Sequence, residues 1–200
     1  MDIVSSVSAI FGAVIGAGIA GFFTIKATQK SFDNQKTQAE ENEEKLIKGV
    51  LQAIHDEIET VFDRYQEAMG SRVEALEKGH ALTFYYPLVS DFFSVYTGNS
   101  FLIGRIPSND LRKQIIKTYT LAKGIIDTFR LNNDLVGKYE FSEKLYAESN
   151  LEVHKQQAIA HYHGLVSYAE NIKDSHKELK QEVTKLLRML RKNGVLNEKN

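Results

Sequence analysis

The stretch LIKGVLQAIHDEIETVFDRYQEAMG, residues 46–70, sets the structural class of this chain. Its apolar residues recur at alternating steps of four and three, which is the spacing of one face of an α-helix. These residues are Ile47, Leu51, Ile54, Ile58, Val61, Tyr65 and Ala68. Val50, Phe62, Met69 and Val73 make the stripe wider than a two-stranded coiled-coil seam. The stretch therefore predicts a helix that contributes one face to a helical bundle.

The sequence that follows predicts a short second helix. Gly79 comes after two charged residues and is expected to end the first helix. The second helix is expected to begin near Tyr86 or Pro87, since proline is tolerated in a first turn, and to end around residues 98–99. Residues 100–106 are expected to be a connector.

Two long helices are expected to complete the bundle. The first begins after Pro107, with Ser108 or Asn109 as its N-cap, and the pair Asn132-Asn133 is expected to break or kink it. The last helix is expected from about Leu151 to Lys192, with Gly194 at the C′ position.

The chain is thus predicted to be all-α, with an antiparallel helical bundle at residues 46–194. Upstream, residues 27–45 contain no Pro or Gly and only Phe32 as a large apolar residue, which predicts a polar helical stalk. Residues 195–200 are expected to be a disordered tail. Residues 1–26 are expected to form a transmembrane anchor.

The anchor prediction comes from Ile3 to Ile25, 23 consecutive residues without a charge. A helix of that length spans roughly 34 Å, enough to cross a hydrocarbon core of about 30 Å. A cleaved signal peptide is the weaker alternative, because the segment is long and no Lys or Arg precedes it. Lys26, Lys30 and Lys36 follow the span and only Asp2 precedes it, so the positive-inside rule predicts a cytoplasmic C-terminal domain and an external N-terminus.

Small residues recur every four positions along this span and are expected to form one smooth face. Such a face allows two helices to approach closely in lipid, and it predicts self-association or packing on a partner span. The competing interpretation is that Gly and Ala are common in transmembrane helices. The residues expected to pack are Ser8, Gly12, Ala13, Gly16, Ala17 and Ala20.

Two surfaces are candidates for other contacts. The stretch from Phe84 to Phe101 is the richest in aromatic residues; most of it is expected in the core, with Tyr85, Tyr86 and Tyr96 exposed as a candidate partner-binding surface. The last helix ends in a basic amphipathic segment, which is a candidate for docking on an anionic membrane surface. Its basic residues are Lys185, Arg188, Arg191 and Lys192.

Motifs for catalysis or cofactor binding are not recognised, so neither an enzyme nor a cofactor is expected. The run from Gly98 to Arg105 departs from a phosphate-binding loop in its spacing and lacks the Lys and the Ser or Thr. His154, His161 and His163 lack the further ligands of a zinc or di-iron site, so no metal is expected. A net charge of −1 and the absence of a nucleic-acid-binding motif argue against a nucleic-acid partner.

One block resembles a known group of proteins. It comprises FSVYTGN at residues 93–99, Ile103-Gly104, and the segment from Leu111-Arg112 to Tyr119. About a third of the chain resembles the middle of uncharacterised bacterial and prophage proteins that have one N-terminal span and a helical cytoplasmic domain. The resemblance implies a helical fold and a bacterial inner-membrane setting, and it assigns no active-site residue.

The sequence therefore predicts a single-pass inner-membrane protein that self-associates and binds a cytoplasmic protein partner, with phage exclusion or infection sensing as a suitable setting. The alternative is an oligomeric effector whose spans permeabilise the bilayer, which would collapse the membrane potential on overexpression. An enzyme with an unrecognised site ranks third.

Overall fold

The computed structural model describes the backbone of residues 3–87 and 92–193, with side chains described from Thr24 onward within those ranges. Every regular element in these residues is a helix, which confirms the predicted all-α class. The chain divides into two units, residues 1–46 and residues 47–200.

The first unit consists of the N-terminal part of α1, which runs from Ile3 to Tyr65. The predicted stalk at residues 27–45 is helical, and its side chains are exposed except at Glu43, as expected for a helix without an apolar face. Among the residues that the structure describes, no helix has the length and apolarity needed to cross a membrane. The predicted packing residues Ser8, Gly12, Ala13, Gly16, Ala17 and Ala20 lie outside the described side chains.

The second unit begins with the C-terminal part of α1, whose apolar stripe is buried as the periodicity predicts. Ile54 and Ile58 are almost fully buried. The helix does not continue regularly to Gly79, however: a π-helical turn, η1, covers Gln66–Gly70, and a short α2 covers Ser71–Ala75. Gly79 lies beyond it in a turn, with a φ of +83° that favours glycine.

The predicted helix from Tyr86 to about residue 98 is wrong. Residues 76–87 contain no helix, and α3 covers only Ser94–Gly98. The helix begins no earlier than Ser94 because Phe93 has a left-handed φ of 74°, which is incompatible with a right-handed helix. The predicted connector is also partly wrong, because α4 occupies Ser100–Gly104.

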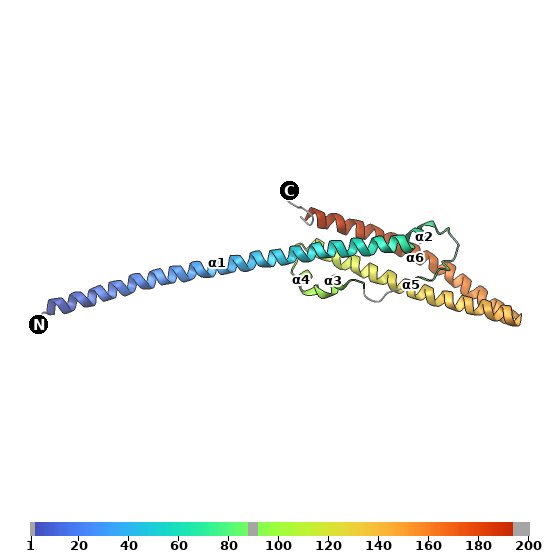
Figure 1. Cartoon of the computed structure of the whole chain (residues 1–200), viewed down its shortest axis with the longest axis horizontal. Helices are drawn as coiled ribbons and strands as arrows, with labels where there is room; N and C mark the ends of the chain where they lie inside the picture. Colours follow the sequence, from blue (N-terminus) through green and yellow to red (C-terminus); the bar gives the residue numbers. More distant parts are fainter. Residues whose placement is uncertain (1–2, 88–91, 194–200) are drawn as a thin grey trace. The chain divides into compact units, whose positions relative to one another are not determined.

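The two long helices form an antiparallel hairpin (Figure 1), with α5 at Asn109–Ser149 and α6 at Glu152–Lys192. Ser108 is the N-cap of α5, as predicted: its Oγ accepts a hydrogen bond from the Leu111 N–H at 3.3 Å. The helices are joined at Asn150, a residue type that tolerates the left-handed conformation it adopts here.

The predicted break at Asn132-Asn133 is wrong, because α5 runs through both residues. Their side chains bond to another segment rather than to their own backbone. The amide of Asn132 donates to the Leu82 carbonyl at 3.1 Å, and Asn133 both accepts from the N–H and donates to the carbonyl of Tyr86. The two asparagines therefore hold residues 82–86, a non-helical strap, against α5.

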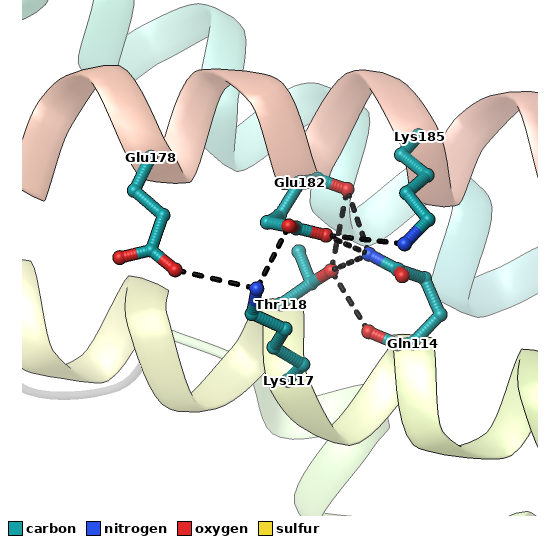
Figure 2. A network of polar contacts seen from close by, with 6 residues as sticks. All are labelled: Gln114, Lys117, Thr118, Glu178, Glu182 and Lys185. Atoms are coloured by element: carbon teal, nitrogen blue, oxygen red, sulfur yellow. Dashed lines mark hydrogen bonds and ion pairs between the residues drawn. The ribbon is translucent and has the colours of Figure 1, made fainter.

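A polar network joins the N-terminal part of α5 to the C-terminal part of α6 (Figure 2), and its Gln114 and Thr118 side chains are buried. The Gln114 amide donates to both the side chain and the backbone carbonyl of Glu182. The Thr118 hydroxyl donates to the Gln114 carbonyl at 2.9 Å and lies 3.4 Å from the same Glu182 carbonyl. Lys117 contacts Glu182 at 2.8 Å and Glu178 at 3.3 Å. The lysine and the amide hold the pKa of the Glu182 carboxyl below its ordinary value. These contacts set the register of the two helices.

The main core includes residues of α1, α5 and α6 but ends at Phe129 on α5 and begins again at Ala169 on α6. Beyond these positions lies the distal hairpin, which we define as residues 134–167. Its buried residues, Val136, Ser142, Ala158 and Leu165, are not part of the main core. Every side-chain hydrogen bond, ion pair and ring contact described for residues 134–167 stays within the distal hairpin.

Candidate functional site

The three tyrosines predicted to form a partner-binding surface do not share one environment. Tyr85 is 70% exposed. Tyr86 is half-buried, with its ring edge-to-face on Phe129, and Tyr96 stacks on Tyr119 with ring centroids 4.1 Å apart. Only Tyr85 therefore offers most of its ring to another molecule.

Two exposed phenylalanines flank these tyrosines in sequence, and each ring is covered by an arginine. The Arg72 guanidinium lies 4.7 Å from the Phe84 ring centroid, and that of Arg105 lies 4.5 Å from Phe101. Cation–π contacts of this kind stabilise an exposed ring without burying it.

Tyr96 and its neighbour Val95 are held by a carboxylate that was not predicted as a site residue. Glu57 of α1 accepts hydrogen bonds from the backbone N–H groups of Val95 and Tyr96, at 2.7 and 3.2 Å, and from the hydroxyl of Tyr119 at 2.8 Å. It thus satisfies the free N–H groups in the first turn of α3, where Phe93 offers no capping side chain. Burial, and next the bond to Glu57, raises the pKa of the Tyr119 hydroxyl.

The predicted lipid-surface residues at the end of α6 are all exposed, but two of them are paired. Arg191 contacts Glu59 of α1 at 3.0 Å, and Lys185 lies 3.8 Å from Glu182. Arg188 lines an open groove between α2 and α6, whereas Lys192 lies at the end of the helix. Part of this positive charge therefore stabilises contacts within the second unit.

A buried histidine not considered as a site from the sequence joins three elements. His176 of α6 is 3% exposed; its Nδ1 lies 2.9 Å from the hydroxyl of Tyr65, and its Nε2 lies 2.9 Å from the carboxylate of Glu74. Because an ionised carboxylate can only accept, Nε2 donates to Glu74, and Nδ1 shares a hydrogen bond with the Tyr65 hydroxyl. Lys180 completes the chain of contacts at 2.6 Å from Glu74.

The π-helical turn makes this arrangement possible. Nine residues separate Tyr65 from Glu74, so in a regular α-helix they would lie on opposite faces. The wider turn of η1 brings both toward His176. Gly70 provides the space, because a Cβ at that position would clash with the Gln66 amide and lie 3.2 Å from the His176 ring.

The electrostatics of this chain of contacts are polarised. Hydrogen bonds from Lys180 and then His176 lower the pKa of Glu74 to about 2, and burial raises the pKa of the Tyr65 hydroxyl. A hydroxyl with a raised pKa is a hydrogen-bond donor rather than a nucleophile. The arrangement can position a proton, and its evident effect is to tie α6 to the end of α1.

Within the residues that the structure describes, no group of three or more His, Asp or Glu side chains is placed to hold a metal ion. His161 and His163 are partly buried or exposed along α6, and His154 lies near the tip of the hairpin. Comparisons with protein-family models, with curated proteins and with solved structures found no match to this chain.

Proposed function

We propose that this chain is a single-pass bacterial membrane protein that self-associates through its N-terminal span and binds a protein partner with its helical domain. The resemblance of residues 93–119 to prophage proteins favours phage exclusion or infection sensing as the setting. A protein of this kind acts by binding other proteins. The polar clusters of the domain agree with this, because they join its helices to one another.

The observation that carries the proposal is the distal hairpin. Two helices alone can bury only one stripe of each, so the remaining apolar side chains stay in contact with water. Phe141 is 63% exposed. Three aliphatic side chains of the distal hairpin are exposed as well: Leu151, Val153 and Ile159. These exposed apolar side chains are the surface that we propose for contact with the partner.

The chain contains no cysteine, so self-association can be tested by introducing one. Ala13→Cys places a thiol on the small-residue face and Val14→Cys places one on the bulky face of the predicted span. After oxidation of native membranes, we expect a disulfide-linked dimer from Ala13→Cys and little from Val14→Cys. Equal cross-linking of the two, or none, would contradict an oriented self-association.

Partner binding can be tested with two isoleucines of matched exposure. Ile159 in the distal hairpin is 41% exposed, and Ile116 on the part of α5 in the main core is 44% exposed. A photo-crosslinking amino acid placed at position 159 in cells should give a discrete adduct with a second protein, and the same residue at position 116 should not. The adduct should be lost when Phe141→Ser is added; an adduct that is equal at both positions would contradict the proposal.

A further inference from the structure

A cleft of about 450 Å³ opens into the main core of the second unit. Its walls come from α1, α5 and α6, from Tyr86 of the strap and from residues next to the strap, and all described lining residues except Arg64 are apolar or aromatic. They include Phe62, Tyr65, Tyr86, Ala122, Ile125 and Phe129. Small-molecule sites in proteins have this range of volume and this predominance of apolar lining.

Few of the described residues that line the cleft have a polar group. Arg64 is its only charged lining residue among the described side chains, and no carboxylate lines it. The Tyr86 hydroxyl makes no hydrogen bond to any residue that the structure describes, and Tyr86 lines the same cleft as Arg64. The Tyr65 hydroxyl is already engaged with His176. Among the described residues, the cleft therefore has one cation and one phenol without a hydrogen-bond partner, and its other walls are apolar or aromatic apart from the Tyr65 hydroxyl.

We propose that this cleft binds an amphiphile with one acyl chain and one carboxylate. Its hydrocarbon chain would lie along Ile125 and Phe129, where it would remove apolar walls from water. Its carboxylate would pair with Arg64 and accept a hydrogen bond from Tyr86. The match of charge excludes cationic amphiphiles as good ligands, and a single cation favours a monoanion over a phosphate. The site is independent of the small-residue face and of the distal hairpin.

The probe is a dodecanoate that carries a photoactivatable diazirine within its chain and a terminal alkyne. Full-length protein in membrane vesicles is irradiated with the probe, and labelled peptides are identified by mass spectrometry. We expect labelling within α5 around residues 122–129 and around Phe62. Unlabelled dodecanoate should compete, whereas dodecyltrimethylammonium should not.

Two variants separate binding in the cleft from general partition into lipid. Arg64→Gln should raise the concentration for half-maximal labelling about tenfold, the effect of losing one charge-assisted bond. Arg130→Gln, which removes an exposed arginine paired with Asp127, should leave it unchanged. Ala122→Phe should fill the cleft and abolish labelling, and Gly124→Phe adds the same ring at an exposed position of α5 as its control.

Labelling spread over many peptides, equal competition by the cationic amphiphile, or labelling unchanged in Arg64→Gln would each overturn the proposal. Arg64 is exposed, so its replacement tests the site even if Ala122→Phe disturbs the core. Failure here would leave the disulfide and photo-crosslinking tests of the proposed function unaffected.

Discussion

At the scale of single residues, this domain uses polar side chains on α1 to organise segments far away in the sequence. Glu57 and Tyr65 lie on the helix that the apolar periodicity predicted, yet their partners are 38 to 111 residues distant. Periodicity indicates which face of a helix is buried, but it does not indicate which polar group on that face will meet which partner. Glu57 and His176 therefore could not be singled out from the sequence.

Glu57 should be one of the most sensitive polar residues of the domain. Glu57→Ala leaves the buried Tyr119 hydroxyl and the first turn of α3 without their acceptor, and we expect the free energy of unfolding to fall by about 3 kcal/mol. Glu59→Ala on the same helix removes an exposed pair with Arg191 and should cost less than about 1 kcal/mol. Denaturant unfolding measures both, and equal losses would show that Glu57 does not organise α3.

Glu74 should make stability depend on pH in the acid range. Its folded pKa of about 2 lies below the ordinary value of 4.5, so the stabilisation is present above 4.5 and is lost as the pH falls toward 2. We expect Glu74→Gln to lower the Tm at pH 7 and the difference from the unmutated protein to narrow between pH 4.5 and pH 2. A difference that is constant over this range would contradict an ionised Glu74 as the source of the effect.

At the scale of elements, the two long helices could be predicted and the segment between Gly79 and Pro107 could not. The long helices have apolar stripes over many turns and a clear N-cap at Ser108. The intervening segment is short of periodic signal, and its conformation depends on distant side chains. Asn132 and Asn133 illustrate this: asparagine is poor within helices when it bonds locally, but here both side chains bond to the strap.

The strap should therefore be released by a change on α5. Asn133→Ala removes both hydrogen bonds to Tyr86 and improves the intrinsic helix propensity of α5. We expect limited proteolysis to cut residues 80–87 several times faster, while the helical circular dichroism stays unchanged. Asp134→Ala, at the next exposed position, serves as the control, and equal cleavage of the two variants would contradict the role of Asn133.

At the scale of the whole molecule, the all-α class followed from the sequence, while the separate character of the distal hairpin did not. The apolar pattern of α6 continues past the end of the main core. Periodicity alone therefore does not show where α1 stops packing against α5 and α6. Val136 and Leu165 are as buried as core residues, although they lie outside the main core.

Shortening the distal hairpin should leave the rest of the second unit folded. Deletion of residues 138–144 together with 157–163 removes seven residues from each helix, which nearly preserves the helical phase. Because no residue of the main core is lost, we expect cooperative unfolding with a Tm within about 4 °C of that of the intact chain, a shift of under 1 kcal/mol. Loss of cooperative unfolding, followed by circular dichroism at 222 nm, would show that the distal hairpin supports the core.

The five-residue π segment has a genetic consequence. A π-helical turn accommodates one residue more than the α-helical turn it replaces, so Gln66–Gly70 contains one residue more than a regular helix needs there. Deleting a single codon there would restore regular hydrogen bonding and leave everything downstream on the same face, because eight regular positions turn the helix by about as much as the nine present positions do. Glu74 would still face His176, whereas the same deletion in the regular part of α1 would rotate everything downstream by about 100°. In this helix, the place of a deletion therefore decides its effect.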